Sequence, residues 1–114
     1  MRVYISGPIT GIPDGNIEAF NYAEKLLREA GHDPVNPNKL DCADGDTWEQ
    51  CMRRDIATLM SCDALLYLPG SDKSKEADFE VKIALTVGIP AYSQTVFFKY
   101  VNESAKSLLV KSNK

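Results

Sequence analysis

The sequence predicts an α/β fold, with a single doubly wound, mostly parallel sheet and helices on both faces. Short apolar runs alternate along the chain with longer segments whose apolar residues recur every three or four positions. The clearest run, Ala64–Leu68, is typical of a strand buried on both faces of a parallel sheet, and Pro69-Gly70 ends it. A chain of 114 residues is expected to form one domain, spanning residues 1–114.

Charge and hydropathy exclude some classes of partner. The net charge of −3 leaves little basic charge for neutralising phosphates, so we expect neither nucleic acid nor a membrane as a partner. Arg53-Arg54 is expected on a solvated helix face. No segment approaches the roughly 18 apolar residues of a membrane span. Because Met1-Arg2 leads directly into a strand, without a signal-type stretch, we expect a cytoplasmic protein.

The first expected unit is a strand followed by a helix. The strand Arg2–Ser6 leads into the loop Ser6–Gly11, whose two glycines and proline let the backbone approach a ligand closely. This loop is not the dinucleotide-binding fingerprint, because the third glycine and the acidic ribose-binding residue are missing. Apolar spacing predicts a helix from Asn16 to Ala30, and Gly31 is its stop signal.

A short second strand is expected at His32–Val35, and a polar loop at Leu40–Asp46. The loop aspartates superficially resemble a calcium site, but the closing glutamate is missing, so we expect no calcium. They are Asp41, Asp44 and Asp46. His32, the only histidine, is expected at the surface, because no second histidine or adjacent nucleophile accompanies it. The sequence predicts neither a metal nor a cofactor.

The three cysteines show neither metal-binding nor redox spacing, which fits reduced thiols. They are Cys42, Cys51 and Cys62. The last two fall in or next to a predicted helix, where we expect them to be packing residues.

Thr47 is expected to cap a helix that runs to about Ser61. Its predicted core stripe consists of Trp48, Met52, Ile56, Leu59 and Met60. Asp55 lies at the margin of this stripe. Two interpretations of Asp55 stay open at this stage: an ordinary surface acid, or a carboxylate that leans over the end of the sheet.

The segment from Glu76 to Val87 predicts a largely buried helix, which follows a polar loop at Ser71–Lys75. Its apolar positions are Ala77, Val81, Ala84 and Leu85, with Phe79, Ile83 and Val87 on the flank. Glu80 lies within this pattern, and a buried carboxylate is costly enough that it usually serves a function. The alternative is that Glu80 lies at the edge of the stripe and reaches solvent or a lysine.

The last elements complete the predicted fold. Gly88–Tyr92 is typical of a helix stop and a fourth short strand, Val96–Val110 of a packing helix, and Ser112–Lys114 of a tail. This order gives a flavodoxin/Rossmann-like sheet, which binds ligands at the carboxyl ends of its strands where the chain order reverses. The rule brings the loops Ser6–Gly11 and Pro69–Lys75 to one edge.

Several segments, taken in order, resemble the nucleoside 2-deoxyribosyltransferase superfamily, and within it a small, uncharacterised, often phage-borne branch. The resemblance covers roughly Val3 to Pro90. The segments that carry it are Tyr4-Ile5-Ser6-Gly7-Pro8-Ile9-Thr10-Gly11, Asn36-Pro37, Trp48, Met52-Arg53-Arg54-Asp55, Cys62-Asp63-Ala64, Pro69-Gly70, Ser74 and Glu80.

The resemblance implies catalytic roles for three residues. Glu80 would attack the anomeric carbon of a nucleoside or nucleoside monophosphate, Asp55 would assist departure of the base, and Tyr4 would position the nucleophile. It also implies substrate contacts from Ser6, Gly7, Pro8, Ile9, Thr10, Gly11, Gly70 and Ser74. Relatives of this size form homo-oligomers, and the apolar stripe within Val96–Leu109 offers a surface for a second copy.

Two departures from the superfamily leave the substrate open. Glu76 stands where the superfamily often has glycine, and its carboxylate would crowd a phosphate beside Ser74. Thr10 stands nearest to the place where monophosphate hydrolases of the superfamily have an arginine. The backbone amides of the first loop could still bind a phosphate. Hydrolysis and transfer are both possible outcomes, and the alternative to an enzyme is a non-catalytic binding module, a sensor or sponge for a nucleotide-derived metabolite.

Overall fold

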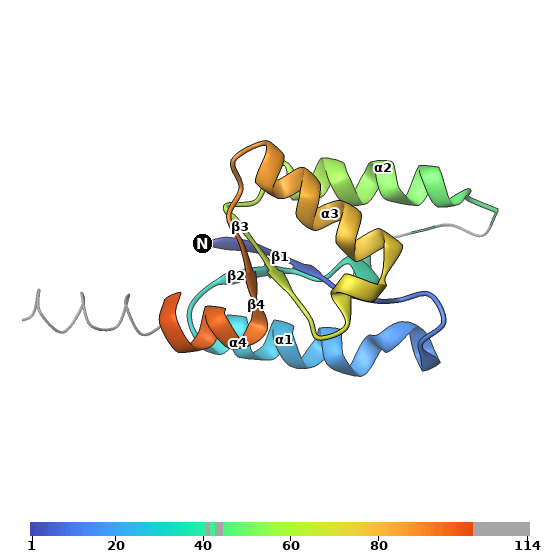
Figure 1. The fold of residues 1–114 in the computed structure, drawn as a ribbon. Helices are drawn as coiled ribbons and strands as arrows, with labels where there is room; N and C mark the ends of the chain where they lie inside the picture. Colours follow the sequence, from blue (N-terminus) through green and yellow to red (C-terminus); the bar gives the residue numbers. More distant parts are fainter. Residues whose placement is uncertain (41, 43–44, 102–114) are drawn as a thin grey trace, which may run out of the picture.

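The protein forms one parallel β-sheet flanked by helices. The computed structural model describes residues 1–40, 42 and 45–101. Its strands lie in the order β2-β1-β3-β4, and the three pairings between neighbouring strands are all parallel (Figure 1). Their bounds are β1 Arg2–Ser6, β2 Asp33–Val35, β3 Ala64–Tyr67 and β4 Ala91–Ser93. The predicted parallel sheet is therefore confirmed.

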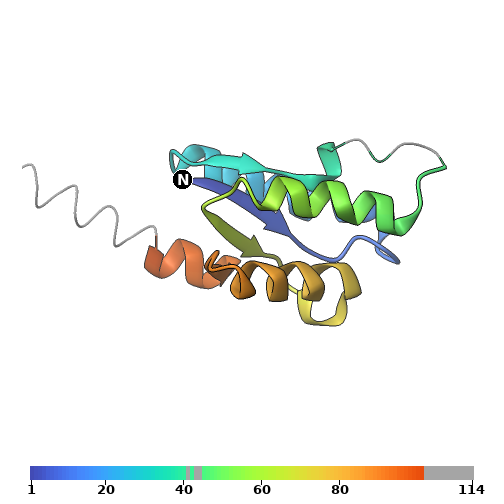
Figure 2. The ribbon, with the colours of Figure 1, turned by 90° about the horizontal axis from the view of Figure 1, so that it is seen from above.

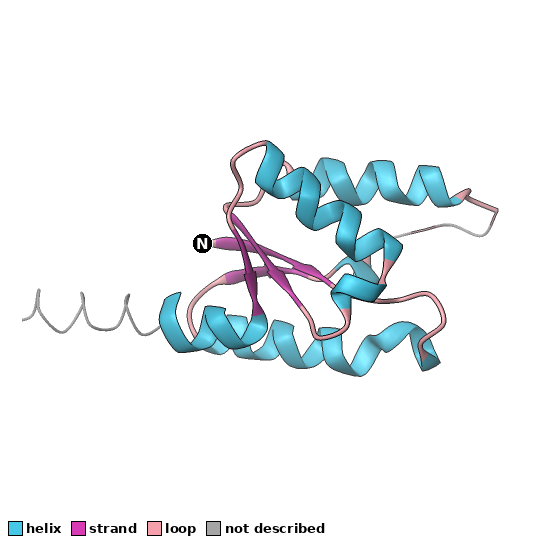
Figure 3. Ribbon diagram, viewed as in Figure 1, coloured by secondary structure: helices cyan, strands magenta, loops and turns pink. Residues whose placement is uncertain are grey.

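Helices cover both faces of the sheet, as expected for a doubly wound fold (Figures 1 and 3). The helices α1 and α4 lie on one face, and α2 and α3 lie on the other. The α-helices are α1 Ile17–Glu29, α2 Trp48–Leu59, α3 Lys75–Thr86 and α4 Gln94–Val96. Short 3₁₀ segments at Pro13–Asn16, Pro37–Lys39 and Ser71–Lys73 and a π-helical turn at Phe97–Val101 complete the set. The view from above shows α2 and α3 side by side (Figure 2).

The chain order places a crevice beside β1. The chain passes from β1 to β2 on one side and then returns to β3 on the other side of β1. The order of the strands therefore reverses between β1 and β3, and a ligand crevice is expected outside their carboxyl ends. Gly7 lets the two strand ends approach each other, because a Cβ added there would lie 2.7 Å from Leu68 Cδ1.

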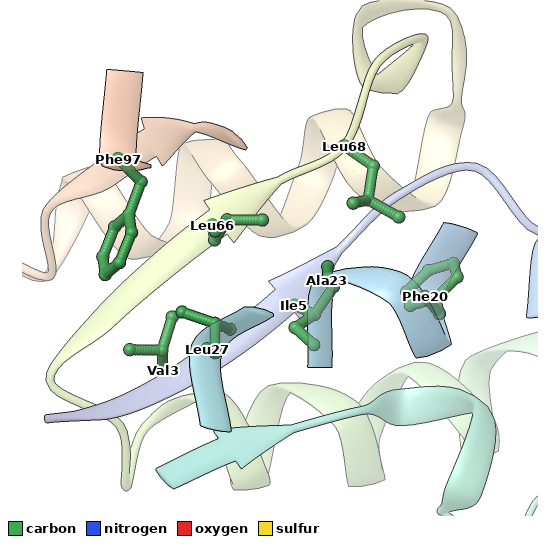
Figure 4. Packing of buried hydrophobic residues seen from close by; sticks show 8 residues of the cluster. All are labelled: Val3, Ile5, Phe20, Ala23, Leu27, Leu66, Leu68 and Phe97. Atoms are coloured by element: carbon green, nitrogen blue, oxygen red, sulfur yellow. The ribbon is translucent and has the colours of Figure 1, made fainter. Parts of the chain in front are cut away.

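Strand alternation divides the core into two layers. Side chains of a strand point alternately to the two faces of the sheet, so Val3 and Ile5 face α1 whereas Tyr4 and Ser6 face α3. Figure 4 shows the layer on the α1 side, made of Val3, Ile5, Phe20, Ala23, Leu27, Leu66, Leu68 and Phe97. The layer on the α3 side contains Tyr4, Val35, Leu59, Cys62, Leu65 and Ala84.

The predicted bounds of α1, α2 and α3 are correct to within about two residues, but the predicted core faces of α2 and α3 are too wide. The helix expected from Val96 instead begins at Gln94 and gives way to the π-helical turn at Phe97. Phe79 and Leu85 of α3, and Val87 at its C-cap, are 46%, 58% and 53% exposed. Trp48, the first residue of α2, and Met60, its C-cap, are 37% and 43% exposed. A helix that covers one face of a sheet buries a stripe rather than its whole circumference, so the flanking apolar residues remain at the surface. The prediction of a largely buried α3 was therefore wrong.

Some sequence-based expectations fall outside the described residues. Asp41, Asp44, the part of the expected helix beyond Val101 and the tail Ser112–Lys114 lie there. Most of the stripe within Val96–Leu109 does too, and the homo-oligomer stays a prediction. Within the described residues, none of the helices has the length and apolar character needed to cross a membrane.

The cysteines correct one expectation. Cys42 and Cys51, expected to be reduced thiols, form a disulfide with their Cα atoms 5.6 Å apart, within the range that a disulfide requires. Sequence spacing could not reveal this pair, because only folding brings Cys42 against Cys51 in the first turn of α2. Cys62 is a buried free thiol in the α3-side core, as expected for a packing residue.

We expect the disulfide to stabilise the fold. The bond joins residues nine positions apart, and closing a loop of this size contributes roughly 2–3 kcal/mol by reducing the entropy of the unfolded chain. Urea unfolding with and without a reductant should show a loss of this order. Cys51→Ser should reproduce the loss and then be insensitive to reductant; equal stability of all three samples would contradict the expectation.

Candidate active site

Glu80 is a buried carboxylate held by two hydroxyl groups from β1. It lies three residues after Ala77 and four before Ala84 on the buried stripe of α3, and it is 4% exposed. The Tyr4 hydroxyl donates to Oε2 at 2.6 Å, and the Ser6 hydroxyl donates to Oε1 at 2.8 Å. The structure thus decides between the two interpretations of Glu80: the carboxylate points into the protein, does not reach open solvent, and pairs with no lysine of the described residues.

The surroundings of Glu80 keep its carboxyl close to its titration point at neutral pH. Burial raises the pKa of Glu80 to about 7; the hydrogen bonds from Tyr4 and Ser6 oppose the shift, and the charges of Asp55 and Glu76 add to it. Burial, followed by the charges of Glu80 and Asp55, raises the pKa of Tyr4 far above its ordinary value. Tyr4 therefore remains a hydrogen-bond donor at any physiological pH.

Asp55 brings a second carboxyl group to the same cavity. It lies on α2 and is half-buried. Burial raises its pKa to about 6, although the positive charge of Arg54 opposes the shift. The charge of Asp55 also raises the pKa of Glu80, so an ionised Asp55 disfavours ionisation of Glu80. Of the two interpretations of Asp55, the structure supports the carboxylate at the end of the sheet.

The two carboxyl groups line a cavity of about 410 Å³, a size suited to a small-molecule ligand. Its walls come from the loop after β1, the residues after β2, and the helices α2 and α3. Of the predicted substrate-binding residues, it includes Gly7, Ile9 and Thr10. Ser6 lies behind the cavity wall, where it contacts Glu80.

A second cavity, of about 680 Å³, adjoins the first. The predicted binding residues Pro8, Thr10, Gly70 and Ser74 line it. Three residues, Thr10, Trp48 and Glu76, line both cavities. Gly11, also predicted to bind substrate, lines neither of these two cavities. The predicted site is thus mostly brought together, but over two adjoining hollows rather than one.

Sequence reasoning missed two residues of the site. Trp48, predicted as a core residue, lies at the boundary of the two cavities, where the Lys75 ammonium is 4.3 Å from its ring centroid. Arg54, predicted on a solvated face, forms an ion pair with Asp46, and both line the first cavity. The sequence signal for Arg54 was its position next to Asp55, in the segment Met52-Arg53-Arg54-Asp55 that resembles the superfamily.

A cluster of possible metal ligands also lies on the first cavity. In the described part of the chain, the ligand atoms of Cys42, Asp46 and Cys51 lie within 4.8 Å of one another. The two sulfur atoms are bonded to each other, and a metal requires free thiolates. The arrangement therefore does not fit a metal centre.

The fold is that of the nucleoside 2-deoxyribosyltransferases. A solved 2-deoxyribosyltransferase from Bacillus psychrosaccharolyticus matches with a TM-score of 0.65 at 18% identity, covering 82% of this chain and 71% of that one. A 2-deoxyribosyltransferase from Leishmania mexicana matches with a TM-score of 0.62 at 22% identity, covering 81% of this chain and 62% of that one. The chain belongs to the family described as Domain of unknown function (DUF4406), whose model matches residues 1–93. No curated protein matches the sequence.

Burial of Glu80 predicts a pH-dependent cost to stability. Its pKa of about 7 in the folded protein lies above the ordinary value of 4.5. Below about pH 4.5 the group is protonated in both the folded and the unfolded protein, and the full stability is present. As the pH rises from there through 7, the unfolded protein ionises first, and this part of the stability is lost. Relative to the unchanged protein, Glu80→Gln should gain stability between pH 5 and pH 8, by on the order of 3 kcal/mol. The measurement is urea unfolding at each pH.

Glu18→Gln, which removes an exposed carboxylate from α1, is the matched control and should show no such gain. A difference between Glu80→Gln and the unchanged protein that is the same at pH 5 and pH 8 would contradict the assignment of a raised pKa.

Proposed function

We propose that the protein is an enzyme that cleaves or transfers the N-glycosidic bond of a nucleoside or nucleoside monophosphate. The observation that carries the proposal is the Glu80 carboxylate at the cavity wall, held by Tyr4 and Ser6 and accompanied by Asp55 in the same cavity. The likeness of the fold to that of 2-deoxyribosyltransferases supports it.

The proposed reaction proceeds through a glycosyl ester of Glu80. A carboxylate oxygen of Glu80 attacks the anomeric carbon, and the bond between that carbon and the base nitrogen breaks. The base leaves with the bonding electron pair and takes a proton from Asp55. Water or a second base then attacks the same carbon, gives up a proton to Asp55 and releases the Glu80 carboxylate, so that the configuration is retained overall.

The geometry gives each residue a separate task. Tyr4 and Ser6 each donate to a different oxygen of Glu80, which fixes the plane of the carboxylate. They also stabilise its ionised form, the form that attacks. Asp55 supplies a proton from the cavity wall, and its pKa of about 6 lies close to the value of about 7 for Glu80. The reacting form, in which Glu80 is ionised and Asp55 is protonated, is the minor one of the two singly protonated forms, because the higher pKa of Glu80 favours the proton on that residue.

The cavity also offers contacts for the two parts of a nucleoside. The Trp48 ring lies at its edge and provides an aromatic surface on which a base can stack. Gly7, Ile9 and Thr10 line the cavity from the loop after β1, at the carboxyl end of the strand that carries Tyr4 and Ser6. We therefore propose that the sugar binds between that loop and Glu80.

The test is the release of free base from a panel of nucleosides and nucleoside monophosphates, measured by chromatography. Glu80→Gln, nearly isosteric, should lower the rate by several orders of magnitude and leave ligand binding largely intact, because it removes the nucleophile. Asp55→Asn should lower the rate less, and least for bases that depart readily. Tyr4→Phe should have the smallest effect of the three.

The control is Glu18→Gln, which should retain full activity. Wild-type turnover by Glu80→Gln on an active substrate would contradict the mechanism. Tight binding of one compound without any product would instead favour a non-catalytic sensor or sponge of the same fold.

A further inference from the structure

Glu76 joins three elements at the boundary between the two cavities. Its Oε1 accepts hydrogen bonds from the Thr10 hydroxyl at 2.8 Å and from the Trp48 indole N–H at 3.3 Å. Its Oε2 accepts from the Ser74 hydroxyl at 3.1 Å. These donors belong to the loop after β1, the first turn of α2 and the N-cap of α3. The carboxylate therefore bridges the cleft at the start of α3.

The hydrogen-bonding capacity of this carboxylate is filled by the protein itself. Glu76 also accepts a hydrogen bond from its own backbone N–H, in the first turn of α3. An ionised carboxylate has about four acceptor sites, and four protein donors occupy them. Burial alone would raise the pKa of Glu76, but these hydrogen bonds lower it below the ordinary value. Glu76 is thus a fixed negative charge at neutral pH.

A helix N-terminus with free N–H groups and neighbouring hydroxyl groups is a common place for a phosphate to bind. Here the hydroxyl and indole donors around the start of α3 are already used by Glu76. The Ser74 hydroxyl, in addition, accepts from the backbone N–H of Ala77 at 3.2 Å. A phosphate at this place would have to compete with an internal anion for the same donors.

The charges that line the first cavity also disfavour a phosphate. Four carboxyl groups line it, those of Asp46, Asp55, Glu76 and Glu80. The guanidinium of Arg54 also lines it, and it is ion-paired with Asp46. Lys73 and Lys75 line the second cavity, not the one that contains Glu80. A dianionic phosphate would meet mainly like charge beside the reacting group.

We infer that Glu76 is a specificity-determining residue: its carboxylate occupies the place of a ligand phosphate, so that the substrate is an unphosphorylated nucleoside rather than a nucleoside 5′-monophosphate. The inference rests on the proposed function and narrows its substrate class. Removing the carboxylate would release the hydroxyl and indole donors together and convert the boundary of the two cavities into a place that accepts an anion.

The experiment compares the dissociation constants of nucleosides and of their 5′-monophosphates by calorimetry. It uses the Glu80→Gln background, in which no base is released during the titration. With Glu76 intact, the nucleoside should bind at least tenfold more tightly than its monophosphate. Glu76→Ala should reduce this preference tenfold or reverse it. Glu76→Gln, which is nearly isosteric, should shift the preference in the same direction. This variant replaces Glu76→Ala if the alanine variant is too unstable to measure.

Asp78→Asn is the matched control, because it removes one negative charge from the same helix at a position paired with Lys82. It should change the preference less than twofold. Tighter binding of the monophosphate with Glu76 intact, or an unchanged preference in both Glu76 variants, would overturn the inference. If the inference about Glu76 fails in this way but the unaltered protein still releases base from nucleosides, the proposed function stands. Neither binding nor cleavage of any nucleoside would overturn both.

Discussion

The site depends on the hydrogen bonds that the buried carboxylate of Glu80 accepts. A carboxyl group in a nearly closed environment requires hydrogen-bond partners, because burial without them is costly. Glu80 obtains two from β1, and the spacing of those two residues is set by strand geometry. Residues two apart on a strand point to the same face, so Tyr4 and Ser6 together reach both oxygens of the carboxylate. The neighbouring residues Val3 and Ile5 fill the opposite core layer.

The same geometry divides structural from chemical roles along a single strand. The α1 side of β1 is wholly apolar at Val3 and Ile5, whereas its α3 side bears the hydroxyl groups. Gly7 then brings the end of β1 close to Leu68, at the point where the chain order reverses. Gly7 also lines the cavity that contains the two carboxyl groups, and Thr10, in the same loop, donates to Glu76. The site thus depends on the topology of the sheet as well as on the individual residues.

Much of the fold could be predicted because its signals are local. Apolar runs, stop signals and the Thr47 cap located the strands and helices, and the structure adds a capping box between Thr47 and Gln50. The width of a buried face is not local, since it depends on what packs against the helix, and so Leu85 and Trp48 were wrongly expected in the core. The disulfide between Cys42 and Cys51 and the bridging contacts of Glu76 likewise depend on chain segments that meet only in the folded protein.

The central claim is that Glu80 forms a covalent bond with the sugar, and trapping that ester tests it most directly. A nucleoside with fluorine at the 2-position of its sugar should slow the breakdown of the intermediate, because fluorine destabilises an oxocarbenium-like transition state. Intact-protein mass spectrometry should then show one added sugar, located by proteolysis on the peptide that contains Glu80 and absent from Glu80→Gln. Release of base with no adduct at any time, or an adduct on another residue, would contradict the account.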